Sequence, residues 1–327
     1  MDEPRITAVP AVSQLPASRL PVRSISLALV VMMVVYAGMA TQADWAALGA
    51  AASALPAALW AQLALLSLLS YLLRFARWHR FIAALGHHVP GMRNLEIYLA
   101  AFALTLTPGK AGETIRSVYL HRYGVSYPHS IAAFVSERLL DLLAVGGMAS
   151  LAITIFPEQQ HWMLAAIACI LISVFLLRSR LLALIGKRLA RGAAPAAKAV
   201  ATIRFLLSGR RLAVATALSL MAWAAQGISL YLIVHALGYQ LPASTVIAIY
   251  CLSILAGAAS FIPGGLGATE AAIVLLLSAT GVSQADAIIA SLINRSLTLW
   301  LAISIGVMAM TRTILLHQPT RSPPLSR

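Results

Sequence analysis

The stretch Phe261-Ile-Pro-Gly-Gly-Leu-Gly-Ala-Thr-Glu270 interrupts an apolar segment at a point where a membrane helix would be expected to continue. The earlier stretch Thr107-Pro-Gly-Lys-Ala-Gly-Glu113 interrupts another apolar segment in the same way. The two stretches share a register 157 positions apart, which matches Glu113 with Glu270, Gly124-Val125-Ser126 with Gly281-Val282-Ser283, and Arg138 with Arg295. Shared composition does not explain a register kept over this distance, so we infer an internal duplication.

These breaks have a physical meaning inside a membrane. Hydrocarbon offers no hydrogen-bond partner to a free backbone N–H or C=O group, so a break survives only against protein or a water-filled cavity. Matching breaks in two halves point to a transporter's binding site, and a helix restarting after a break directs its positive dipole end there, which favours an anion. The alternative is helix kinking and close packing alone. The break residues are Pro108, Gly109, Gly112, Pro263, Gly264, Gly265 and Gly267.

The composition is that of a polytopic helical membrane protein. The 327 residues are 60% hydrophobic and only 10% charged, and the mean hydropathy is +0.86. Several apolar segments reach the roughly 18 residues that mark a spanning helix. The formal net charge of +14 is concentrated in loops, which indicates a membrane surface and not nucleic acid. Cys169 and Cys251 lie in apolar segments, where packing is a better explanation than a disulfide or a metal site.

Lysine and arginine define the expected topology. Full spans are predicted at about 25–41, 55–73, 130–155, 162–177, 212–236 and 285–310. The second is expected to end in the basic cluster Arg74–Arg80, with Trp78 at the depth of the lipid headgroups. The loops assigned to the outside contain no Lys or Arg, so the positive-inside rule places both termini in the cytoplasm. Residues 1–24 and 313–327 are interpreted as cytoplasmic tails, the first of them disordered.

The segment 178–211 contains nine basic residues and no acidic one, which marks it as cytoplasmic. Between the cations, Leu181, Leu182, Leu184, Ile185 and Leu189 recur at helical spacing, as in an amphipathic helix on an anionic inner leaflet. A solvated basic linker is the alternative. This segment would separate the two repeat halves, about 55–177 and 212–312, within a transmembrane domain covering 25–312.

Two more apolar pairs, at about 94–121 and 243–280, are each divided by one of the breaks. The first pair begins and ends near basic residues and is expected to enter from the cytoplasm, whereas the second is expected to enter from outside. We therefore predict an all-α fold of about six full spans and two re-entrant hairpins in an inverted repeat, as in many secondary transporters. Alternatively, each hairpin crosses the membrane twice, which leaves every loop on the same side.

A few ionisable side chains fall at membrane depth, where a charge costs roughly 2.5–3.5 kcal/mol and is usually paired inside the bundle. The repeat predicts the ion pairs Glu113–Arg138 and Glu270–Arg295. The first half carries extra charge where the second has Ile273, Asn294 and Thr298, so the site should be asymmetric. The candidate substrate-binding residues are Lys110, Arg116, Arg138, Arg295, Glu113, Glu137, Asp141, Glu270 and Asn294. The alternative is that the ion pairs only fasten the hairpins.

No feature of the sequence indicates an enzyme. The glycine-rich breaks lack the Gly-Lys-Ser/Thr ending of a nucleotide loop, the eight histidines lack metal-ligand spacing, and there is no nucleophile elbow. We therefore expect no catalytic residue, no cofactor and no metal.

The motifs Pro108-Gly-Lys-Ala-Gly-Glu-Thr-Ile-Arg116, Ser136-Glu-Arg-Leu-Leu-Asp141 and Phe261–Glu270 resemble those of one membrane family. The chain is similar, from about 25 to 312, to the transmembrane flippase-like domain of lysylphosphatidylglycerol synthases and to stand-alone proteins sharing that domain. In the synthases a soluble aminoacyl-transferring domain follows. The resemblance therefore implies a lipid-translocating part without the lipid-modifying part.

We expect a translocase of polar or anionic lipids, or of lipid-linked envelope intermediates, in the bacterial cytoplasmic membrane. A proton- or sodium-coupled carrier of a small soluble anion is one rival, and a closed cavity without a lateral opening to lipid would favour it. The second rival is an accessory protein that docks an envelope-lipid biosynthetic enzyme through 178–211. A homo-oligomer is a further possible assembly.

Overall fold

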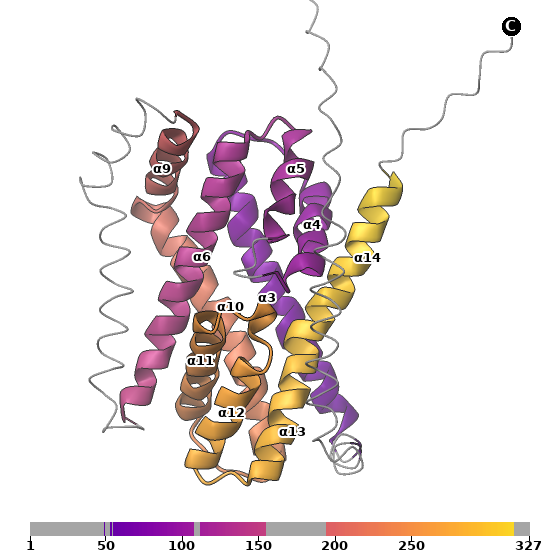
Figure 1. Cartoon of the computed structure of the whole chain (residues 1–327), viewed down its shortest axis with the longest axis vertical. Coiled ribbons are helices and arrows are strands. Elements are labelled where there is room, and N and C mark those ends of the chain that lie inside the picture. The colour runs from indigo at the N-terminus through magenta and orange to yellow at the C-terminus, as the bar shows by residue number, and fades with distance from the viewer. Residues whose placement is uncertain (1–48, 50–52, 54, 108–111, 155–193, 317–327) are drawn as a thin grey trace, which may run out of the picture.

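The computed structural model describes residues 49, 53, 55–107, 112–154 and 194–316, and every regular element within these ranges is a helix (Figure 1). In chain order the elements are α3 (Ala57–Ala84), α4 (Gly91–Ala100), a 3-10 turn (Ala101–Leu104), α5 (Ile115–His121), α6 (Tyr127–Ala149), a 3-10 segment (Ser150–Thr154), α9 (Ala194–Leu206), α10 (Gly209–Ala236), α11 (Ala243–Ala259), a 3-10 turn (Pro263–Gly265), α12 (Ala268–Ala279), α13 (Gln284–Arg295), a π-helical turn (Ser296–Trp300) and α14 (Leu301–Leu316).

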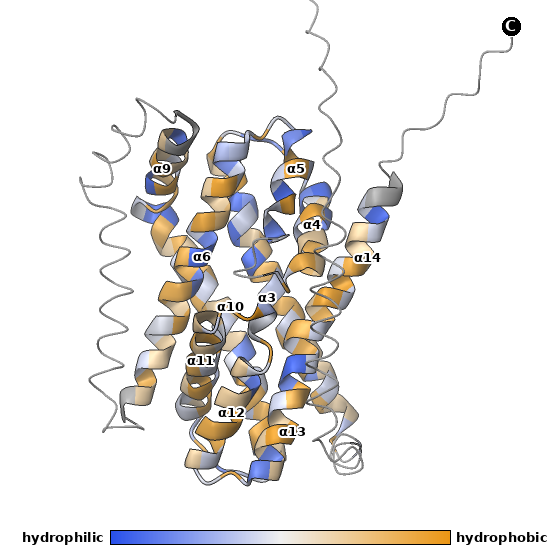
Figure 2. Ribbon diagram, viewed as in Figure 1, coloured by the Kyte–Doolittle hydropathy of each residue, from blue (hydrophilic) through white to orange (hydrophobic). Residues whose placement is uncertain are grey.

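Three continuous helices in the described part are long and apolar enough to cross a membrane: 57–84, 209–236 and 284–313. At 1.5 Å per residue a helix of 28 residues is about 42 Å long, which exceeds the roughly 30 Å of hydrocarbon. Large apolar side chains such as Leu65, Leu275 and Met308 are more than half exposed. Figure 2 shows hydrophobic residues along α12 and α14. The molecule is therefore a helical membrane protein.

Two pairs of short helices are packed between the long ones, at opposite ends of the bundle (Figure 1). The first hairpin is formed by α4, its 3-10 extension and α5, and the second by α11 and α12, which pack against each other. The tips of the hairpins meet in the middle, where Leu106 of the first and Leu266 of the second share a small hydrophobic cluster with Leu299 and Ile303. This shared cluster brings the tips of the two hairpins into contact.

Glycine is needed at the tip of the second hairpin for backbone geometry. Gly264, Gly265 and Gly267 have φ values of 66°, 65° and 78°, a region that other residues seldom adopt. A Cβ atom on Gly264 would also lie 2.7 Å from Cδ2 of Leu106, on the tip of the first hairpin. The predicted break at 261–270 therefore makes the sharp turn and allows the tips to touch.

The prediction for the end of the second span was wrong. The helix does not end near residue 73 but continues through the basic cluster to Ala84. Trp78 is fully buried and Arg77 is 1% exposed, so neither lies at the level of the lipid headgroups. The reason is that the matching carboxylates lie on α6, and ion pairing with them makes burial of the basic turn possible.

The helices at three other predicted spans, α6, α10 and α13–α14, begin and end close to the predicted residues. Residues 194–206 of the basic linker form α9, which packs against α6 and buries Leu206 and Leu207 next to the same helix. Cys251 is buried as a free cysteine. The predicted spans at 25–41 and 162–177, the apolar stripe at 181–189, the tail 1–24 and Cys169 lie outside the described residues.

The structure extends the internal repeat to helices that lie outside the 157-position register found in the sequence. Helices α3 and α10 both have 28 residues, and a shift of 152 positions places Tyr71 with Trp223 and Arg74 with Gln226. The same shift places Tyr98 with Tyr250. Two large hydrophobic clusters each contain residues of both halves.

Candidate functional site

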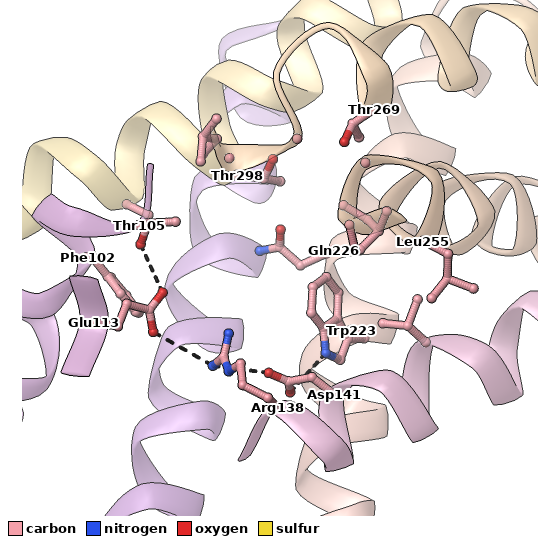
Figure 3. A pocket seen from close by; sticks show the side chains of 18 of the residues that line it. Phe102, Thr105, Glu113, Arg138, Asp141, Trp223, Gln226, Leu255, Thr269 and Thr298 are labelled. Atoms are coloured by element: carbon pink, nitrogen blue, oxygen red, sulfur yellow. Dashed lines mark hydrogen bonds and ion pairs between the residues drawn. The ribbon is translucent and has the colours of Figure 1, made fainter. Parts of the chain in front are cut away.

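A cavity of about 320 Å³ lies between the two hairpins and is lined by residues of both halves. Figure 3 shows Glu113, Arg138 and Asp141 on one side of it, with Thr269 and Thr298 opposite. The three pairs named above, Tyr71 and Trp223, Arg74 and Gln226, and Tyr98 and Tyr250, all line this cavity. The duplicated sequence therefore builds one shared cavity from two related walls.

The first half surrounds the cavity with a network of buried ion pairs centred on Arg77. Its Nη1 donates a hydrogen bond of 2.7 Å to Oδ1 of Asp141, and its Nη2 lies 3.3 Å from Oε1 of Glu137. Nη1 also donates to Oγ of Ser219 on α10. Because Glu137 and Asp141 are one turn apart on α6, a single guanidinium joins α3, α6 and α10.

Arg116 fastens the first hairpin from behind. Its Nη1 and Nη2 donate to Oε2 of Glu137 at 2.9 Å and Oε2 of Glu113 at 3.2 Å, while Nε donates to the Glu113 carbonyl. The guanidinium also lies 4.2 Å from the ring centre of Trp78 and 4.8 Å from that of Tyr98. Arg116 does not line the cavity, so its contacts are those of a buried hairpin anchor.

The predicted pair of Glu113 and Arg138 is confirmed at the wall of the cavity. Arg138 Nη2 is 3.8 Å from Oε2 of Glu113 and 3.2 Å from Oδ2 of Asp141. The Arg138 side chain is 22% exposed. Glu113 also accepts a 3.1 Å hydrogen bond from Thr105. Arg138 is thus loosely shared between two carboxylates and keeps part of its surface open to the cavity.

The predicted pair of Glu270 and Arg295 is also confirmed, with Nε donating to Oε1 at 2.7 Å. Arg295 Nη2 donates a second bond of 2.9 Å to the carbonyl of Gly264 at the hairpin tip. One arginine therefore holds both the start of α12 and the break before it. Asn294, at the position matching Glu137, is fully buried, and its Oδ1 and Nδ2 have no hydrogen-bond partner in the described part of the chain.

The helix after Arg295 contains a π-helical turn, Ser296–Trp300, beside the cavity. Tyr71 on α3 donates its hydroxyl to the carbonyl oxygens of Thr298 at 2.9 Å and Leu297 at 3.3 Å. Such turns free carbonyl groups from the regular helix ladder and are frequent at functional sites. The sequence gave no sign of this irregularity, because no proline or glycine marks it.

The candidate residues from the sequence fall into three groups. The cavity is lined by Glu113, Arg138, Asp141, Arg295, Gly264 and Gly265. Four candidates lie behind this wall as partners or packing residues: Arg116, Glu137, Glu270 and Asn294. Gly112 donates its N–H to Thr107 within the first hairpin tip, whereas Pro108, Gly109 and Lys110 lie outside the described residues.

Sequence reasoning missed Arg74 and Arg77, which were interpreted as part of a basic helix end. A signal was available, because Ser67, Ser70, Arg74 and Arg77 follow one another at spacings of three and four residues. That spacing puts all four on one face of a helix, and the structure buries all four. Trp223 and Gln226 on α10 were also missed, because they carry no charge.

The mouth of the cavity is apolar. Leu142 of α6 and Phe261 and Ile262 of the second hairpin line the cavity and are 42%, 79% and 42% exposed. Phe261 also has a positive φ of 55°, an uncommon and strained conformation for a bulky side chain. The cavity therefore opens past exposed hydrophobic side chains. No group of three or more His, Cys, Asp or Glu residues suited to a metal ion occurs in the described ranges.

Residues 23–306 match the family model described as the lysylphosphatidylglycerol synthase TM region. The chain belongs to this family of membrane proteins. It is similar to a UPF0104 membrane protein of Pyrococcus horikoshii, with 25% identity over 73% of this chain and 82% of the relative. A UPF0104 membrane protein of Methanothermobacter thermautotrophicus is 24% identical over 72% of this chain and 79% of its own length.

Proposed function

We propose that the protein translocates polar or anionic lipids, or lipid-linked envelope intermediates, across the cytoplasmic membrane of a bacterium, as a flippase or scramblase. The observation that carries the proposal is the cavity, whose charged wall lies beside exposed apolar residues at its mouth. A lipid needs only a polar path for its headgroup, since its acyl chains stay in the bilayer. An apolar mouth beside a charged interior suits such a molecule.

In this proposal the chain has about six full spans and two re-entrant hairpins in an inverted repeat. Figure 1 supports opposite orientations, because the α3–α4 and α5–α6 connections lie at the upper end of the bundle and the α10–α11 and α12–α13 turns at the lower end. Arg93, Arg122 and Arg312 belong to the upper end, whereas 237–242 and 280–283 contain no Lys or Arg. In the proposal the upper end of the bundle and both termini lie in the cytoplasm, which the positive-inside rule favours.

Transport would proceed by rocking of one repeat against the other around the cavity. Arg138 and Arg295 line the wall and would bind an anionic or zwitterionic headgroup. The start of α12 adds its dipole, since Thr269 in its first turn also lines the cavity. Arg116 would act by holding the first hairpin and not by touching the lipid.

The carrier of a small soluble anion is less well supported, because the cavity opens past Leu142, Phe261 and Ile262, which are exposed and apolar. The docking of a lipid-modifying enzyme depends on the basic segment 178–211, of which 178–193 lies outside the described residues. In our proposal that segment binds the anionic inner leaflet, and an enzyme or a second copy of the chain would be an additional partner.

The test is lipid movement in reconstituted liposomes that contain fluorescent lipids of different headgroups. We expect wild-type protein to move at least one of them, and Arg138→Ala and Arg295→Ala to slow that movement at least tenfold while remaining folded. Arg312→Ala is the matched control, because Arg312 is exposed near the end of α14. If folded wild-type protein moves no lipid, with or without an imposed proton gradient, the proposal is wrong.

A further inference from the structure

Arg74 on α3 is a buried cation without an ion-pair partner among the described residues. Only 9% of the residue is exposed, and its Nε atom has no hydrogen-bond acceptor. The guanidinium stacks on the ring of Trp223 with a distance of 4.1 Å to the ring centre. Both residues line the cavity. The stack orients the arginine but does not neutralise it.

The other interior arginines show why Arg74 is unusual. Each of Arg77, Arg116, Arg138 and Arg295 lies within 4.0 Å of at least one carboxylate oxygen. The nearby carboxylate of Asp141 accepts hydrogen bonds from Arg77 and Trp223 at Oδ1, and its Oδ2 lies 3.2 Å from Nη2 of Arg138. The described interior thus holds five arginines (74, 77, 116, 138 and 295) and four carboxylates (113, 137, 141 and 270). An uncompensated buried charge is costly.

A second donor without a partner lines the same cavity. Gln226 is 3% exposed, its Oε1 accepts from the hydroxyl of Tyr250 at 3.3 Å, and its Nε2 has no acceptor among the described residues. Gln226 stands at the position that matches Arg74 in the repeat. Two buried donors of equivalent origin, one charged and one neutral, therefore lack acceptors in one cavity.

We propose that the Arg74–Trp223 stack, with Gln226, binds the singly charged phosphodiester group of a lipid headgroup. This inference rests on the proposed function and identifies the substrate class. One negative charge balances the surplus guanidinium, and the phosphodiester oxygens accept bonds from both donors. A cavity of about 320 Å³ accommodates a headgroup. The acyl chains extend past Leu142, Phe261 and Ile262 into the bilayer.

Binding of short-chain lipids to the purified full chain in a non-ionic detergent tests this inference, by titration calorimetry. The probes are dihexanoyl phosphatidylglycerol, dihexanoylglycerol without phosphate, and inorganic phosphate. We expect phosphatidylglycerol to bind, dihexanoylglycerol to bind at least tenfold more weakly, and Arg74→Gln to lose at least tenfold in affinity. Arg74→Lys should recover only part of this loss, because an ammonium group lacks the planar stack. Gln226→Leu should lower the affinity for phosphatidylglycerol a few-fold.

The exposed Arg312→Gln is the matched control and should bind like the wild type. Arg74→Gln should also be at least as stable as wild type without lipid, because it removes a charge that has no carboxylate partner. The inference is overturned if Arg74→Gln binds phosphatidylglycerol as tightly as wild type does, or if the lipid without phosphate binds equally well. If inorganic phosphate binds as tightly as the lipid does, the anion recognised by the site is not specifically that of a lipid headgroup, and the inference is wrong.

The binding result is separable from transport. If wild-type protein binds phosphatidylglycerol through Arg74 but moves no lipid in liposomes, the site stands and translocation is wrong. If lipid moves equally well in wild type and Arg74→Gln, translocation stands and this site is wrong.

Discussion

The two halves of the molecule share a frame but differ in what holds that frame together. Both contain a long helix, α3 or α10, a broken hairpin, and a Glu–Arg pair between the hairpin and the following helix. In the first half, three carboxylates and three arginines form a continuous buried network. In the described part of the second half, Glu270–Arg295 is the one ion pair, and Gly257 and Gly265 allow close packing of the hairpin.

The difference shows that the shared frame does not depend on the additional charged residues of the first half. Ile273, Asn294 and Thr298 replace Arg116, Glu137 and Asp141 in the second half, and the hairpin is still formed. The ion network is therefore not required to make a hairpin. Its concentration in one half places most of the charge on one wall of the cavity, so that wall is expected to provide most of the headgroup binding.

The largest effect is expected at the matched positions 137 and 294. Glu137→Gln removes a carboxylate that pairs with both Arg77 and Arg116. The network then has one more buried guanidinium than carboxylates, and breaking a buried ion pair in this way costs about 3–5 kcal/mol. Asn294→Leu should lower stability by less than about 1 kcal/mol or should raise it, because neither polar atom of the Asn294 side chain has a hydrogen-bond partner among the described residues. SDS titration in mixed micelles, followed by circular dichroism, measures both.

The prediction depends on the difference in stability loss between Glu137→Gln and Asn294→Leu. If Asn294→Leu destabilised the protein as much as Glu137→Gln, the second half would contain a polar network equivalent to that of the first. The comparison drawn above would then be broken.

A smaller effect is expected where the second hairpin has a glycine and the first has a threonine. Gly257 on α11 matches Thr105 of the first hairpin by the same 152-position shift, and a Cβ atom there would clash with Oγ1 of Thr269 and lie 3.2 Å from its Cβ. Gly257→Ala should cost about 1–3 kcal/mol, as other cases of overpacking do. Adding Thr269→Ala should recover a large part of the loss in the same SDS titration.

The double substitution makes this prediction specific. If Thr269→Ala restores the stability lost in Gly257→Ala, close contact between α11 and α12 forms the second hairpin. An equal loss in the single and the double variant would instead show that Gly257 is required for its backbone, and the packing explanation would be refuted.

The sequence was sufficient to predict the elements that depend on local signals. Pro263 and Gly264 disfavour the continuation of a helix, and the register between the repeats predicted both Glu–Arg pairs. The helical fold and the two divided hairpin segments follow from the same signals.

The parts that could not be predicted depend on contacts between distant segments. Arg77 looked like a residue of a cytoplasmic helix end, because charge near an apolar segment usually marks a membrane boundary. Its burial depends on Glu137 and Asp141, which lie 60 and 64 positions further along the chain. The role of Arg74 depends on α10 in the same way. The π-helical turn has no local signal at all.

The smallest effect concerns matched contacts at opposite ends of the bundle. In the first half His87 Nε2 and His129 Nδ1 are 2.9 Å apart. The corresponding positions of the second half are Tyr239 and Asp286, where the tyrosine hydroxyl donates to the carboxylate at 2.6 Å. One contact therefore consists of two histidine side chains, the residue type whose unperturbed pKa lies near neutral pH, whereas in the other a tyrosine hydroxyl donates to a carboxylate.

His87 lies in the connection between α3 and α4, and burial together with the charge of Lys198 lowers its pKa below 6.5. Because the unfolded chain then binds a proton more readily, stability should be complete above pH 6.5 and should fall as the pH drops below it. His87→Gln should flatten this decline between pH 7 and 5 by less than about 1 kcal/mol, since the ring is partly exposed. Thermal unfolding in detergent at a series of pH values measures the slope. Tyr239→Phe is the matched control, because it removes the corresponding contact without removing a histidine. An unchanged slope in His87→Gln would mean that the acid response arises elsewhere, and the two ends would then be equivalent in their response to pH.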